Sequence, residues 1–176
     1  MKHFDIFIKI ATKWSLSLDE YFFLKSLLEE LKPKKILEFG PGNSTVLFSK
    51  YAKTVESYEN DQEWLKKYFD IYKQYKLNNI SISLFENIYP LTIIPKEKYY
   101  DLIFVDAPWG GWECPNHPTK SRFNTMSFAS KYTDKIILHD TKREREINTI
   151  QYFEELGWKT FFFNSERGMT FLYREK

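Results

Sequence analysis

This sequence has few of the residues that identify several common protein classes. Its one cysteine, Cys114, cannot form a disulfide within the chain, as expected of a protein in a reducing compartment. No apolar run approaches the roughly 20 residues that a membrane-spanning helix needs. The first residues also lack the basic-then-apolar pattern of a secretory signal. We therefore expect a cytoplasmic protein with no membrane span.

A strong charge imbalance is also missing. The formal net charge is +2 over 176 residues, so no broad basic face is implied and nucleic acid is disfavoured as a partner. What the chain has in abundance is aromatic residues, at 19%. A chain of this length can bury the core of one domain.

Helical and strand patterns alternate along the chain. Apolar spacing predicts a helix over 18–31, which Pro33 ends. Short apolar or alternating runs predict seven strands, of which the last two lie at the C-terminal end of the chain. The predicted strands are 36–39, 54–59, 80–85, 100–105, 136–138, 158–163 and 169–173, and the remaining predicted helices are 44–51, 61–76, 124–131 and 144–156.

This alternation predicts an α/β protein with a Rossmann-like, doubly wound, mostly parallel sheet of seven strands. The turn at 164–168 predicts a C-terminal antiparallel hairpin. We expect a single domain over 1–176, made of an N-terminal helical segment (1–33) and a Rossmann-like core (34–174). The run Phe161-Phe162-Phe163 is expected in the sheet core.

The most informative segment is 35–45, where an apolar run ends in a glycine loop. Gly40 and Gly42 would let the backbone turn sharply and approach a ligand closely. Asn43 and Ser44 would open the following helix, whose free amides favour an anionic group. A lone Gly-x-Gly also fits a tight strand-to-helix turn that binds nothing.

Acidic residues flank this loop in a way that favours binding. Glu38 precedes it, and Glu59 ends the next predicted strand, where an acid can accept hydrogen bonds from a ribose diol. Together the loop and these acids predict a nucleoside-containing cofactor lying across the carboxyl ends of parallel strands.

Three polar residues end the fourth and fifth predicted strands. Asp106 follows one, and His139 and Asp140 follow the other, so they should converge above the cofactor. An aspartate or a neutral histidine can accept the proton of a hydroxyl group. Alternatively, Asp106 and Asp140 could hold a divalent cation through oxygen ligands. Both aspartates could instead be structural caps.

The segment after Asp106 offers candidate contacts to a second substrate. Trp109 belongs to a long loop with two tryptophans and two glycines, on which a ring could stack. Arg122 could bind a carboxylate or phosphate at two points. A tryptophan filling the core edge and a solvated arginine are the structural alternatives.

These motifs resemble class I S-adenosylmethionine-dependent methyltransferases. The segment Glu38-Phe39-Gly40-Pro41-Gly42 is similar to their acid-x-Gly-x-Gly motif, and Glu59 matches their ribose-binding acid. The resemblance implies that Glu86 or Asn87 approaches adenine, although an aspartate is common there. It implies S-adenosyl-L-methionine as cofactor, with Glu38, Gly40, Gly42, Asn43 and Ser44 at its methionine portion.

A narrower resemblance involves the second half of the chain. Val105-Asp106-Ala107-Pro108-Trp109-Gly110, then Arg122, then His139-Asp140 is similar to the polysaccharide-biosynthesis methyltransferases, which include glucuronoxylan 4-O-methyltransferase. Ala107 stands where that group has glycine. The long extra segments of the group have no counterpart here, so the identity of its acceptor does not carry over.

The expected function is therefore S-adenosylmethionine-dependent O-methylation of a sugar or glycoconjugate hydroxyl, within polysaccharide biosynthesis. Asp106, supported by His139 and Asp140, is the expected catalytic group, and Trp109 and Arg122 are the expected substrate contacts. A small molecule or glycan would be the partner. Two alternatives share the same loop: a nicotinamide-dependent oxidoreductase, and a non-catalytic Rossmann-like binding module.

Overall fold

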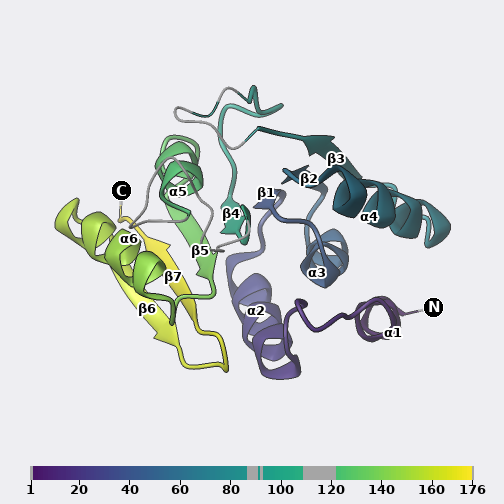
Figure 1. Ribbon diagram of the computed structural model, residues 1–176, viewed down its shortest axis with the longest axis horizontal. Coiled ribbons are helices and arrows are strands. Elements are labelled where there is room, and N and C mark those ends of the chain that lie inside the picture. The colour runs from purple at the N-terminus through teal and green to yellow at the C-terminus, as the bar shows by residue number, and fades with distance from the viewer. Residues whose placement is uncertain (1, 87–90, 92, 109–121, 176) are drawn as a thin grey trace.

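The computed structural model describes residues 2–86, 91, 93–108 and 122–175. Seven strands form one sheet, with helices packed on both of its faces (Figure 1). The elements in chain order are α1 (His3–Lys9), α2 (Leu18–Leu31), β1 (Lys35–Phe39), α3 (Asn43–Tyr51), β2 (Thr54–Glu59), α4 (Gln62–Gln74), β3 (Ile80–Leu84), β4 (Leu102–Val105), α5 (Phe123–Ala129), β5 (Lys135–His139), α6 (Glu144–Glu155), β6 (Lys159–Phe163) and β7 (Met169–Tyr173).

The strand order is β3-β2-β1-β4-β5-β7-β6. Strands β1 to β5 pair in parallel, whereas β7 is antiparallel to both β5 and β6. The predicted Rossmann-like sheet with a closing hairpin is therefore confirmed. The strand order reverses between β1 and β4, and in such sheets this is where ligands bind.

Strand β4 shows why both faces of the sheet must be covered. Its side chains alternate, so Leu102 and Phe104 join the core beneath α2 and α3, while Ile103 and Val105 join the core beneath α5 and α6. All four are fully buried. A continuously apolar strand with covered faces is typical of a central parallel strand.

Helix α1 is an element that the sequence analysis did not predict. It packs against α3 at the N-terminal end of the chain (Figure 1). Ile6 and Ile10 lie in a cluster with Val46 and two tyrosines of α4, and Phe7 contacts Tyr21 of α2. The buried positions span barely two turns, which is too short for a clear helical period.

The expectation that the phenylalanines of β6 lie in the sheet core was wrong for two of the three, whereas Phe163 is partly buried against the core beneath α2 and α3. Phe161 and Phe162 are about half exposed, at 55% and 49%. The reason is that β6 is the last strand of the sheet, so its side chains have few neighbours beyond Phe23 of α2, which stacks on Phe161 and Phe163.

Within the described residues, no helix combines the length and apolar character needed to cross a membrane.

Candidate active site

A cavity of about 450 Å³ opens where the strand order reverses. Its walls come from the β1–α3 loop, the end of β2, the ends of β4 and β5, and the segment between α1 and α2. The volume is within the range of small-molecule sites. Of the predicted site residues, it brings together Gly40, Gly42, Asn43, Ser44, Glu59, Asp106, Arg122 and Asp140.

The two loop glycines do different work. Gly40 has φ +90°, and a Cβ there would lie 3.0 Å from the backbone carbon of Asp106. Gly40 therefore lets β1 and β4 end in close contact. At Gly42 a Cβ would meet only the Ser44 hydroxyl, at 3.9 Å, so the backbone faces open space in the cavity.

Glu38 lies beneath this loop, fully buried. Its carboxylate accepts hydrogen bonds from the hydroxyls of Ser44, Thr45 and Ser57, at 2.5, 2.7 and 2.7 Å. Burial raises the pKa of Glu38 to about 7, although these three donors oppose the shift. The residue ties β1 and β2 to the start of α3 rather than lining the cavity.

Asn43 connects the loop to the segment that precedes α2. Its side chain accepts from the Leu16 backbone N–H at 3.1 Å and donates to the Leu16 carbonyl at 3.2 Å. Arg167, from the β6–β7 turn, donates to the carbonyls of Trp14 and Ser15. These bonds hold residues 14–16 as one wall of the cavity.

Glu59 ends β2 and faces the cavity. Its Oε1 accepts from the backbone N–H groups of Asn60 and Asp61, at 2.7 and 2.9 Å. In the described part of the chain nothing donates to Oε2, so this oxygen is available to a ligand. Burial raises the pKa of Glu59 to about 7, against the two backbone N–H groups.

The polar groups of this region fit S-adenosylmethionine. Gly42 leaves room for a close approach, and the N–H groups at the start of α3 and Oε2 of Glu59 could receive its carboxylate and its ribose. The buried Tyr68 hydroxyl also lines the cavity and has no partner among the described residues.

One of the two predicted adenine contacts, Glu86, is not part of this cavity. Glu86 is exposed just beyond β3 and does not line it. Asn87 and Trp109 lie outside the described residues, so the expectations for them stay predictions.

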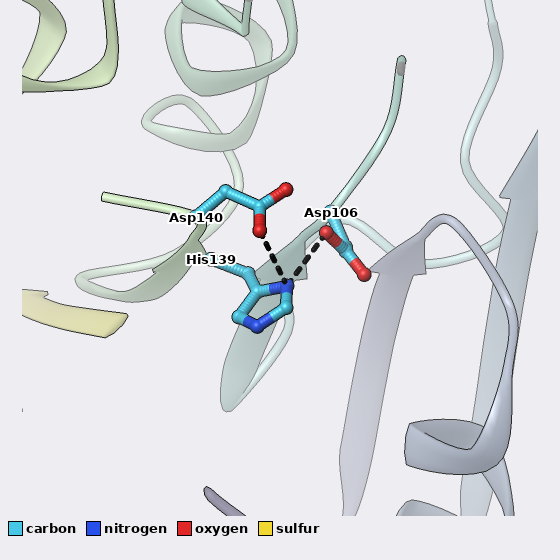
Figure 2. A group of neighbouring side chains, drawn as sticks. All are labelled: Asp106, His139 and Asp140. Carbon is cyan, nitrogen blue, oxygen red and sulfur yellow. Dashed lines mark hydrogen bonds and ion pairs between the residues drawn. The ribbon is translucent and has the colours of Figure 1, made fainter. Parts of the chain in front are cut away.

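Asp106, His139 and Asp140 converge at the ends of β4 and β5. Figure 2 shows both carboxylates pointing toward the same ring nitrogen of His139. Nδ1 of His139 lies 2.8 Å from Oδ1 of Asp106 and 3.8 Å from Oδ1 of Asp140. Asp106 is the most exposed member at 22%, against 0% for His139 and 4% for Asp140.

A fourth residue, Glu20 of α2, completes this group from beneath. Its Oε1 lies 3.1 Å from Nε2 of His139 and accepts from the Ser165 hydroxyl at 2.6 Å. Burial disfavours the charged imidazole, but Asp106 and Glu20 raise the pKa of His139 to about 9. Although burial opposes it, the bond from His139 lowers the pKa of Glu20 to about 2.

Arg122 lies between the two aspartates, 1% exposed. Its Nη2 is 3.0 Å from Oδ1 of Asp106 and 2.9 Å from Oδ2 of Asp140, and its Nη1 donates to the His139 carbonyl at 2.7 Å. Burial opposes ionisation of Asp140, but Arg122, His139 and Arg143 lower its pKa to about 2. Asp140 also adopts a left-handed backbone, with φ 59°, which aspartate tolerates better than most residues.

Sequence reasoning missed the role of Glu20. Glu20 falls in the first turn of the helix predicted over 18–31, and its Oε2 accepts from the Ser17 backbone N–H at 2.9 Å at the start of α2. The second oxygen reaches a histidine 119 positions away. No local pattern signals such a contact.

Comparison with known proteins supports the fold independently. No protein-family model and no curated protein matches the chain. Among solved structures, the O-methyltransferase TomG from Streptomyces achromogenes, in complex with SAM, has a TM-score of 0.73 at 13% identity, over 98% of this chain and 90% of that chain. An O-methyltransferase from Bacillus cereus, in complex with SAH, has a TM-score of 0.69 at 16% identity, over 98% and 90%.

A third similar structure shows how widely this fold is used. It is TrmI, a tRNA methyltransferase from Aquifex aeolicus, with a TM-score of 0.69 at 16% identity, over 100% of this chain and 77% of that chain. At such identities the likeness establishes the methyltransferase fold and nothing finer. Function has to be argued from the site.

Proposed function

We propose that this chain is an S-adenosylmethionine-dependent methyltransferase that acts on a hydroxyl group. The observation that carries the proposal is the placement of Asp106. Its partly exposed carboxylate lines the same cavity as Gly42 and Glu59, the groups that fit the methyl donor. Donor binding and proton acceptance are thereby combined in one site.

S-adenosylmethionine, when bound, supplies an electrophilic methyl group attached to a sulfonium sulfur. Methyl transfer to oxygen is an in-line displacement, so the protein must mainly align the acceptor and take its proton. Oδ1 of Asp106 is fixed by His139 and Arg122. Its Oδ2 receives no hydrogen bond from the described residues and can accept the proton of the hydroxyl.

His139 has a different role from the one its residue type suggests. Both of its ring nitrogens face carboxylates, at 2.8 and 3.1 Å, and the ring is fully buried. An imidazolium that donates a hydrogen bond from each ring nitrogen has no lone pair with which to accept a proton. We therefore assign His139 and Asp140 as positioning groups for Asp106 and Arg122.

For the acceptor we propose a sugar or glycoconjugate. The cavity offers the aromatic side chains of Trp14, Trp64 and Tyr68 together with the guanidinium groups of Arg143 and Arg167. Aromatic faces and charged hydrogen-bond donors are the groups that bind hydroxyl-rich rings. The order of Val105-Asp106-Ala107-Pro108 and His139-Asp140, similar to polysaccharide-modifying enzymes, supports the same class.

The test is a methyl-transfer screen with labelled S-adenosylmethionine against nucleotide sugars, oligosaccharides and small phenols. We expect transfer to at least one sugar, and an Asp106→Asn variant should lose about 100-fold or more in rate while binding S-adenosylhomocysteine as the wild type does. A full rate in this variant would remove Asp106 from the mechanism. Transfer to phenols alone would overturn the acceptor class.

A further inference from the structure

The three side chains Asp106, His139 and Asp140 form the kind of group that commonly holds a metal ion. One ligand atom from each lies within 4.8 Å of the others, and the carboxylates point to one nitrogen (Figure 2). Carboxylate and imidazole ligands together suit several divalent cations. Whether they can bind one depends on what already occupies their lone pairs.

Arg122 already forms ion pairs with both carboxylates. Its Nη2 lies between Oδ1 of Asp106 and Oδ2 of Asp140, within 3.0 Å of each. The guanidinium is held in place by the Pro108 carbonyl, 3.3 Å from Nε, and the His139 carbonyl, 2.7 Å from Nη1. Arg143 adds a second cation, 2.8 Å from Oδ2 of Asp140. A divalent ion would have to displace a buried, fixed positive charge.

His139 is also unsuited to bind a metal in this arrangement. A ligating histidine must present an unprotonated nitrogen, but Nδ1 is 2.8 Å from a carboxylate oxygen and Nε2 is held by Glu20. Among the described residues, two carboxylate oxygens of this group have no hydrogen-bond partner: Oδ2 of Asp106, and Oδ1 of Asp140, which lies 3.6 Å from Nε of Arg167. These two oxygens alone are too few to hold a cation, and both carboxylates already face arginine guanidinium groups.

We infer that Arg122 takes the place of a divalent cation in this centre. The side-chain guanidinium supplies the positive charge between Asp106 and Asp140, and the centre binds no divalent metal while Arg122 is present. This concerns the same site as the proposed function. Its test requires no methyl transfer, so the two can fail separately.

The experiment is a titration of the full chain with Mn²⁺, followed by the electron paramagnetic resonance signal of the free ion. Wild type and Asp106→Asn should bind Mn²⁺ equally weakly. Arg122→Gln removes the charge, keeps a donor for the neighbouring carbonyls and should bind Mn²⁺ about tenfold or more tightly than the wild type. Arg122→Lys, which keeps the charge, should behave as the wild type does. The double variant Arg122→Gln/Asp106→Asn should lose the gain.

Two results would overturn the inference. One is Mn²⁺ binding by the wild type that weakens in Asp106→Asn, because the native carboxylate would then be a metal ligand. The other is a folded Arg122→Gln variant that gains no affinity. If Arg122→Gln does not fold, the inference is tested by comparing Mn²⁺ binding of the wild type with that of Asp106→Asn and Asp140→Asn. Equal binding by all three supports it, and weaker binding by either variant overturns it.

Discussion

At the scale of single residues, the centre depends on a chain of charges that alternate in sign. Glu20, His139, Asp106, Arg122 and Asp140 follow one another through contacts of 2.8 to 3.1 Å. Removing one member of such a buried network leaves its neighbour uncompensated, which costs more than the pair itself contributes. The residues next to Asp106 therefore set both its position and the stability of the fold.

Glu20 gives the clearest test of this network. With a pKa of about 2 for Glu20 and about 9 for His139, the pair is fully charged at pH 7. Its stabilisation is lost as the pH falls from the ordinary carboxylate range toward 2, or rises from the ordinary imidazole range through 9. At pH 7, Glu20→Gln should lower the free energy of unfolding by about 3 kcal/mol.

Urea denaturation measures this difference. Glu30→Gln is the matched control, because Glu30 is an exposed carboxylate on the same helix, and it should change the free energy of unfolding by less than about 0.5 kcal/mol. Equal effects of the two substitutions would show that the buried pair does not act as described.

The raised pKa of Glu59 leads to a prediction of how ligand binding depends on pH. Burial raises its pKa to about 7, so lowering the pH from 8 to 6 converts most of the carboxylate to the neutral acid. We expect the affinity for S-adenosylhomocysteine to fall by up to about tenfold over this range. Glu59→Gln should bind weakly at both pH values. A pH dependence that survives this substitution would have to come from another group.

At the scale of elements, the two glycines of the β1–α3 loop have different roles, because Gly40 is needed for stability and Gly42 for ligand binding. Gly40→Ala should cost about 2 kcal/mol or more of stability, because φ is +90° and the added Cβ would lie 3.0 Å from backbone. Gly42→Ala should leave stability within about 0.5 kcal/mol, because its Cβ has room, yet weaken S-adenosylhomocysteine binding.

Thermal unfolding and ligand titration of the two variants test this contrast. Gly157→Ala is the control for backbone strain alone, since φ is +86° and no atom lies within 4 Å of the added Cβ. If Gly42→Ala binds the ligand as the wild type does, the loop does not face it.

The sequence predicted most elements well because their signals are local. Helix α2 and strands β2 and β7 match their predicted ranges, and Asp61 caps α4 by accepting from the Trp64 backbone N–H. The edge position of β6 and the link from Glu20 to His139 could not be predicted. Both depend on which distant segments pack together.

At the scale of the whole molecule, helix α2 and the segment before it are part of the site. Helix α2 supplies Glu20, the segment before it supplies a cavity wall, and Asn43 and Arg167 bind that segment from two other parts of the chain. Parallel strands bring Glu59 and Asp106 to one edge of the sheet, as their positions in the sequence predicted.

The account as a whole is tested most directly by isothermal titration of the full chain with S-adenosylhomocysteine at pH 8. We predict saturable binding at a single site, with a dissociation constant in the micromolar range, and at least about tenfold weaker binding by Glu59→Gln. Absence of binding at high micromolar ligand, or equal binding by the wild type and Glu59→Gln, would contradict it.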